Sequence, residues 1–117
     1  MLNQKLAINT YRSASRYRSQ REQEADVFRQ VNATLGAARD ANAVRRVRAL
    51  ADNRLLWGTV TTLMRDPANR LPDSLKSSLI SLGLAVEREM DQENPDFNWL
   101  ISINELIASG LSGNTAG

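Results

Sequence analysis

The chain has 117 residues and a net charge of +2, with 42% apolar and 24% charged residues, as expected of a single globular domain. It contains no cysteine and no histidine, which excludes disulfides, thiolate chemistry and histidine-based catalysis or metal binding, and fits a reducing compartment. No apolar run is long enough for a signal peptide or for the roughly 20 residues of a membrane span, so we expect a cytoplasmic protein with no membrane partner.

Positive and negative charges are unevenly distributed along the chain. Residues 1–54 carry eleven Lys or Arg and five Asp or Glu, a net charge of +6, whereas residues 55–117 carry four and eight, a net charge of −4. This asymmetry indicates either an oriented partner surface or simply a dipolar protein.

Residues 1–18 are expected to form a loosely ordered N-terminal arm. Ser19–Glu22 has the sequence of a capping box, in which the first and fourth residues satisfy each other's backbone N–H groups, so the first helix is predicted to begin there. Three- and four-residue steps between apolar residues predict an amphipathic helix that ends near Arg39. These apolar residues are Ala25, Phe28, Val31, Leu35 and Ala38. Asn42 is a candidate N-cap for the next helix, although the first helix could also continue through it.

The second helix is predicted from Ala43 to Met64, and it ends because Asp66 precedes a proline and is biased away from helical geometry. Its inner side is predicted from a set of apolar residues. They are Val47, Leu50, Ala51, Trp57, Val60 and Met64, with Leu56 and Leu63 beside them.

The third helix is predicted to open at Pro72, where the missing N–H of proline costs nothing. Apolar residues then recur with the period of a helix. They are Leu75, Leu79, Leu82, Val86 and Met90, with Ile80 and Leu84 flanking them. Gly83 interrupts this helix and suggests a close approach to another helix, or tolerated slack.

The fourth helix is predicted to begin with Asn94 as N-cap and Pro95 at its first position, and to end at Gly110. Residues 112–117 are small and polar and are expected to be mobile. Short connections favour antiparallel neighbours. The predicted fold is therefore an all-α, four-helix bundle comprising residues 19–111, with an N-terminal arm (1–18) and a C-terminal tail (112–117).

The sequence shows no phosphate-binding loop, cofactor motif or metal-ligand cluster, so we expect neither an enzyme nor a bound cofactor or metal. Arginines near the start of the second helix could contact RNA phosphates. They are Arg39, Arg45, Arg46 and Arg48. No aromatic side chain for base stacking is interleaved with them, so an ordinary solvated helix face is the favoured interpretation.

Two tryptophans and an asparagine stand out in the helical patterns. Trp57 is expected in the core, with its indole N–H bonded to Asn53 one turn earlier. Trp99 is expected to be partly exposed. Asn104 lies among isoleucines and needs a partner, for which Arg54 is one possibility.

Several short motifs along the chain, in their order and spacing, resemble those of the FlaF family of flagellar biosynthesis regulators. The resemblance extends from about Tyr11 to Leu111. The motifs are Tyr11-Arg12, Glu24-x-x-Val27-Phe28-x-x-Val31, Asn53-Arg54-x-Leu56-Trp57, Asn69-x-Leu71-Pro72-x-x-Leu75, Leu79-Ile80-Ser81-Leu82, Leu100-Ile101-x-Ile103-Asn104 and Gly110-Leu111. The chain departs from the family at Ala85, where an aromatic is common, and after Tyr11.

The resemblance implies a non-enzymatic protein that binds flagellin like a chaperone and promotes its synthesis and export. It also implies a functional link to FlbT, a regulator that restrains translation of flagellin mRNA. The terminal segments of flagellin are amphipathic and helical in the filament, and a helical bundle can hold such a segment in an apolar groove. The alternatives are an RNA-binding regulator of flagellin mRNA and an adaptor that binds FlbT.

The predicted partner surface consists of apolar residues of the third and fourth helices that the predicted core does not use. The N-terminal arm is predicted to close across them. Its residues are Tyr11, Ile80, Leu84, Trp99, Ile103 and Ile107. A second set is predicted to be structural. Its residues are Asn53, Trp57, Pro72, Leu82 and Asn104.

Overall fold

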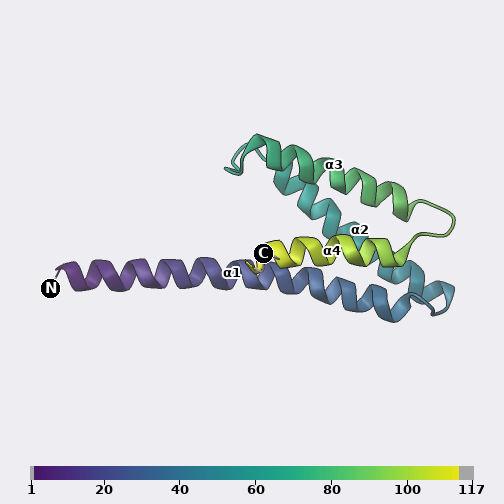
Figure 1. Ribbon diagram of the computed structural model, residues 1–117, viewed down its shortest axis with the longest axis horizontal. Helices are drawn as coiled ribbons and strands as arrows, with labels where there is room; N and C mark the ends of the chain where they lie inside the picture. Colours follow the sequence, from purple (N-terminus) through teal and green to yellow (C-terminus); the bar gives the residue numbers. More distant parts are fainter. Residues whose placement is uncertain (1, 114–117) are drawn as a thin grey trace.

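Four helices follow one another along the chain and confirm the predicted all-α bundle (Figure 1). The computed structural model describes residues 2–113, with the side chains of residues 8, 12, 16 and 20–113. The helices are α1 (Leu2–Ala38), α2 (Ala43–Arg65), α3 (Asp73–Met90) and α4 (Phe97–Leu111).

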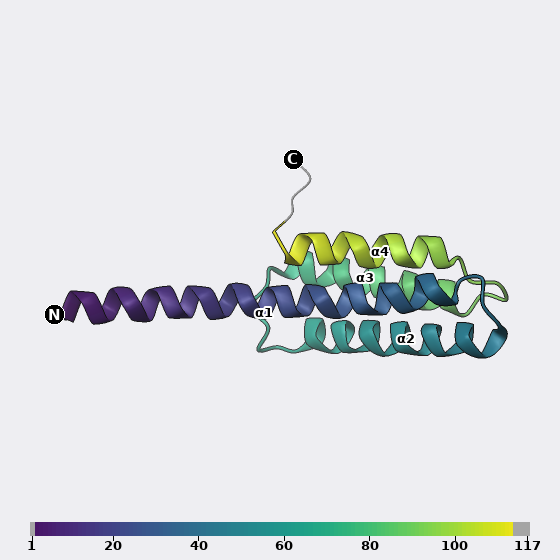
Figure 2. The same ribbon diagram turned by 90° about the horizontal axis from the view of Figure 1, so that it is seen from below.

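Consecutive helices run in opposite directions, as the short connections predict (Figure 1). The backbones of α1 and α4, α1 and α2, and α2 and α3 pack closely. Seen from below, α1 lies between α4 and α2, and α3 lies behind it (Figure 2). The bundle thus consists of two antiparallel pairs, α1 with α4 and α2 with α3, that are joined mainly through α1 and α2.

The first helix begins at Leu2, so the predicted start at Ser19 was wrong. The sequence has no proline or glycine before Gly36, so residues 2–18 contain no strong helix breaker. The N-terminal part of α1 extends beyond the other three helices (Figures 1 and 2), and the longest dimension of the molecule is 64 Å. The division into arm, helical domain and tail stays a prediction, and residues 114–117 of the tail lie outside the described residues.

Side-chain caps fix two of the helix starts. Asn42 caps α2 as predicted, because its Oδ1 accepts a hydrogen bond from the Arg45 N–H at 3.0 Å. At α4 the prediction was wrong: Asp96, rather than Asn94, is the N-cap, and its carboxylate accepts from the Trp99 N–H at 3.0 Å. Asparagine and aspartate are both good N-caps, so the sequence alone did not decide between two starts that lie two residues apart.

The core contains residues from all four helices. Its buried apolar members are Ala25, Phe28, Leu35, Ala38, Ala49, Trp57, Val86, Met90, Phe97, Leu100 and Ala108. Phe28 and Trp57 meet edge to face, with ring centroids 6.1 Å apart, which joins α1 to α2 at the centre. The apolar residues predicted for the inner side of α1 are buried or, for Val31, packed against the core, and the core position predicted for Trp57 is confirmed.

The inner face of α2 differs from the predicted one. Its buried residues are Ala49, Asn53 and Trp57, and the predicted Leu50, Leu56 and Val60 are half-buried against the core. Val47, in contrast, is 64% exposed and Ala51 is also exposed. Apolar residues occur on every side of this helix, and the side that faces the core carries a polar residue. The periodicity of its apolar residues therefore predicts an inner face for α2 that is partly turned to solvent.

Gly83 allows α2 and α3 to approach closely. It is buried, and a Cβ at this position would lie 3.0 Å from Thr61 Oγ1 and 3.5 Å from Trp57 Cε3. We therefore expect Gly83→Val to lower the free energy of unfolding by roughly 1–3 kcal/mol, since the added methyl groups overpack this contact. Urea denaturation measures the change. In a Thr61→Ala background the crowding oxygen is absent. There, Gly83→Ala should raise the free energy of unfolding by up to about 1 kcal/mol, because alanine has a higher helix propensity than glycine. A decrease in the free energy of unfolding in that background would contradict this explanation.

Candidate partner-binding site

A buried chain of polar side chains connects α2, α4 and α3. The Trp57 indole N–H donates to Asn104 Oδ1 at 2.8 Å, and the Asn104 amide donates to Asn53 Oδ1 at 2.7 Å. The Asn53 amide lies 3.3 Å from the Met90 sulfur, a weak acceptor. Both asparagines have no exposed surface. Each polar side chain of this network therefore has a partner on another helix, which fixes how these helices fit together.

The partners predicted for this network were wrong. Asn104, not Asn53, accepts from Trp57, and the partner of the Asn104 amide is Asn53, not Arg54. Arg54 lies at the surface, where it pairs with Asp91 at 3.0 Å. Periodicity along one helix indicates which residues point inwards, but it does not indicate which residue of another helix lies opposite them.

The other two residues predicted to be structural lie in α3 or beside it. Pro72 immediately precedes α3, which begins at Asp73, one residue later than predicted. Leu82 is half-buried and packs against the core.

Two of the four arginines of the predicted RNA surface, Arg39 and Arg46, contact other residues of the bundle through their side chains. Arg46 donates to the Arg39 backbone carbonyl and, at 3.2 Å, to Asn94 Oδ1, while its guanidinium carbon lies 4.5 Å from the Phe97 ring centroid. Arg39 donates to Asn98 Oδ1 at 2.6 Å. Both side chains thus hold the start of α4 against α1 and α2. Arg45 and Arg48 remain exposed.

We expect Arg46→Lys to lower the free energy of unfolding by about 1 kcal/mol, because lysine keeps the charge but lacks the planar group that spans three partners. Chemical denaturation measures the change. Arg45→Lys is the matched control, since Arg45 is exposed and only its backbone N–H bonds to the Asn42 cap. Equal stabilities of the two variants would contradict this role of Arg46.

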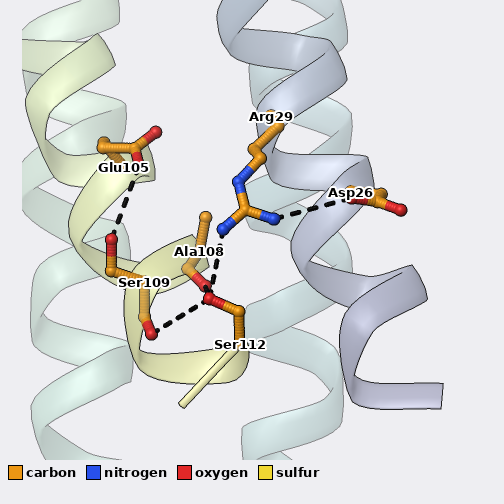
Figure 3. A network of polar contacts seen from close by, with 6 residues as sticks. All are labelled: Asp26, Arg29, Glu105, Ala108, Ser109 and Ser112. Atoms are coloured by element: carbon orange, nitrogen blue, oxygen red, sulfur yellow. Dashed lines mark hydrogen bonds and ion pairs between the residues drawn. The ribbon is translucent and has the colours of Figure 1, made fainter. Parts of the chain in front are cut away.

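The C-terminal end of α4 is held by arginines of α1. The Arg29 guanidinium lies 3.5 Å from Asp26 of the same helix and donates to Ser112 Oγ at 3.1 Å (Figure 3). The second contact links α1 to the residue that caps the end of α4. Arg21 donates to the Gly110 carbonyl at 3.3 Å. Positive charge at a helix C-terminus interacts favourably with the helix dipole. This end of the bundle is also where α1 extends past the other helices (Figure 2).

Five of the six residues of the predicted partner surface lie on α3 and α4, where most of their area is covered, and the sixth, Tyr11, lies within α1. Trp99, Ile103 and Ile107 are half-buried and pack against the core, and Ile80 is also half-buried. Leu84 is 47% exposed. The side chain of Tyr11 lies outside the described residues.

A more exposed apolar surface lies between α1 and α2. Leu55 of α2 is 73% exposed and Val27 of α1 is 49% exposed. These side chains line a shallow groove of about 400 Å³, here called the α1/α2 groove. The groove is lined by Val27, Gln30, Val31, Thr34, Asp52, Leu55, Leu56 and Thr59.

Two further hollows continue the groove along α2. One shares Leu55 and Thr59 with it and reaches Leu63, which is 53% exposed. The other lies between the same two helices and reaches Arg45 and Arg48. From Arg45 to Leu63 the helix rises about 27 Å, enough for about 18 residues of a partner helix. Sequence analysis missed this surface, although the apolar residues on every side of α2 were a signal for it.

The part of the chain that the structure describes has neither a candidate metal-binding cluster nor a helix that could span a membrane. Among residues 2–113, as far as their side chains are described, no three His, Cys, Asp or Glu side chains gather where they could hold a metal ion. Within the same part of the chain, no helix is both long and apolar enough to cross a membrane.

Comparison with known proteins gives one match. The family described as flagellar protein FlaF matches residues 7–111, which is most of the chain. No curated protein and no solved structure matches the chain.

Proposed function

Because the chain belongs to the FlaF family of flagellar proteins, we propose that it binds flagellin in a chaperone-like way and promotes the synthesis and export of flagellin. In this proposal it acts in the cytoplasm as a binding protein, with no catalytic step and no cofactor. The observation that carries the proposal is the α1/α2 groove, an exposed hollow with apolar side chains from two helices.

The groove suits an amphipathic helix. Val27, Val31 and Leu55 offer apolar contacts between two helices that pack side by side, while Gln30 and Thr34 give the groove a polar edge. Contiguous exposed apolar residues with a polar rim are typical of interaction surfaces. Helix-in-groove binding uses anchors at positions i, i+3, i+4 and i+7, the pattern of an amphipathic flagellin segment.

The surface on α3 and α4 predicted from the sequence is the second candidate. If this surface held flagellin in place of the α1/α2 groove, Ile80→Asp/Leu84→Asp would abolish flagellin binding while helicity and melting temperature stayed nearly unchanged. Circular dichroism and a binding titration test this. Because Ile80 is half-buried, unfolding of the variant would assign these residues to the packing of the bundle and would overturn this surface as the binding site.

Isothermal titration of the full chain with monomeric flagellin tests the proposed function. We expect one-to-one binding with a Kd at or below about 1 μM, an affinity within the range of specific interfaces. Flagellin that lacks its terminal segments should not bind. No binding of intact flagellin would contradict the proposal and would leave the adaptor for FlbT and the RNA-binding regulator, each tested by the same titration.

A further inference from the structure

The exposed face of α1 continues from the α1/α2 groove onto the part of the helix that extends beyond the bundle. Arg12, Arg16 and Gln20 follow one another at four-residue steps and are exposed. Val27 and Val31 come seven and eleven residues after Gln20, which places all five residues on the same side of the helix. One partner helix can therefore lie along the groove and along the extension at the same time.

Arginines flank the apolar part of this surface at both ends. Arg12 and Arg16 lie on the extension, and Arg45 and Arg48 line the hollow at the other end. Residues 1–21 contain five Lys or Arg and no Asp or Glu. Asp52 lies between the two basic ends, beside Leu55 and Leu56. The surface is therefore apolar in the middle and positively charged at its ends.

From this pattern we propose that the groove binds a single amphipathic helix with an apolar middle and acidic residues at both ends. The inference rests on the proposed function, in which a flagellin segment supplies this helix. From Arg12 to Ala37, the end of the face, α1 rises about 37 Å, so the partner helix has about 25 residues. Opposite charges across the interface fix the position of the partner along the groove and exclude basic helices.

A protein helix fits this surface better than a nucleic acid does. Single-stranded nucleic acids need aromatic side chains for base stacking. Among the described aromatic side chains, Phe28, Trp57 and Phe97 are buried in the core and Trp99 is half-buried on α4, and none of these four lines the groove or its continuations. The exposed leucine and valine in the middle of the surface have no role in phosphate binding, whereas they match the apolar stripe of an amphipathic helix.

The test is the affinity of the full chain for monomeric flagellin at about 0.05 M and about 0.5 M salt, where the Debye length falls from roughly 14 Å to roughly 4 Å. Arg12→Glu/Arg16→Glu should weaken binding about tenfold at low salt and less than about twofold at high salt, because these charges lie at the rim of the interface. Arg70→Glu/Arg88→Glu is the matched control, since it reverses two exposed arginines outside the groove and should change affinity less than about twofold.

The outcomes separate this inference from the proposed function. If the unaltered chain does not bind flagellin, the proposed function fails and the inference fails with it. If it binds and the two double variants behave alike, only the inference is overturned. A poly-uridine oligonucleotide that binds the unaltered chain, and loses affinity in Arg12→Glu/Arg16→Glu while flagellin binding is unchanged, would assign the extension to nucleic acid and would also overturn the inference.

Discussion

Asn104→Ala is expected to lower the free energy of unfolding by about 2–4 kcal/mol. The substitution leaves the Trp57 N–H and the Asn53 Oδ1 without partners in the interior, and it opens a cavity between α2 and α4. The expected loss is a large part of the total free energy of unfolding, which is typically about 5–15 kcal/mol. Thermal unfolding should show a decrease in Tm of about 10 °C.

Asn98→Ala is the matched control for this prediction. Asn98 lies on the same helix but is exposed, and it accepts one hydrogen bond from the exposed Arg39, so its removal should cost less than about 1 kcal/mol. A double-mutant cycle with Trp57→Phe isolates the hydrogen bond itself and should give a coupling of about 1–2 kcal/mol. Equal losses for Asn98→Ala and Asn104→Ala would contradict the role assigned to the buried network.

Leu55→Glu should weaken flagellin binding roughly tenfold to a hundredfold. If Leu55 anchors the partner helix, the substitution removes an apolar contact and places a charge in a desolvated interface. The fold itself should be unaffected, because the side chain is 73% exposed in the unbound chain. Isothermal titration measures the affinity, and circular dichroism checks that the helices are retained.

Leu106→Glu provides the control for Leu55→Glu. Leu106 is 66% exposed, so the two substitutions make the same chemical change at similarly exposed leucines, but Leu106 lies on α4 and not on α2. Affinity that falls equally in both variants, or in neither, would show that the α1/α2 groove is not the binding site. Loss of binding in Leu106→Glu alone would direct attention to α4.

Most of the fold could be predicted because the residues that start and stop its helices act locally. Asn42 begins α2 with its side-chain cap, and Pro67 ends the helix by restricting the backbone of Asp66. The structure places both ends of α2 where these residues indicate. The start of α1 could not be predicted in the same way. Ser19–Glu22 has the sequence of a helix cap, but the residues before it also favour a helix, and a capping sequence does not prevent a helix from continuing through it.

The candidate site was less accessible from sequence because it depends on which residues of different helices lie opposite each other. The inward orientation of Trp57 followed from its periodicity, whereas its bond to Asn104 depends on how α2 and α4 are placed in the bundle. The groove was missed for a related reason. Leu55 could be assigned to the surface only after Asn53, a polar residue, was known to face the core.

The most direct test of the binding surface is a map of the amide chemical-shift changes in the 15N-labelled chain when monomeric flagellin is added. We expect the largest changes in α1 between residues 27 and 34 and in α2 between residues 51 and 63, where side chains line the groove and its continuation. Changes confined to α3 and α4, around Leu84 and Ile103, would contradict the α1/α2 groove and would favour the surface predicted from the sequence.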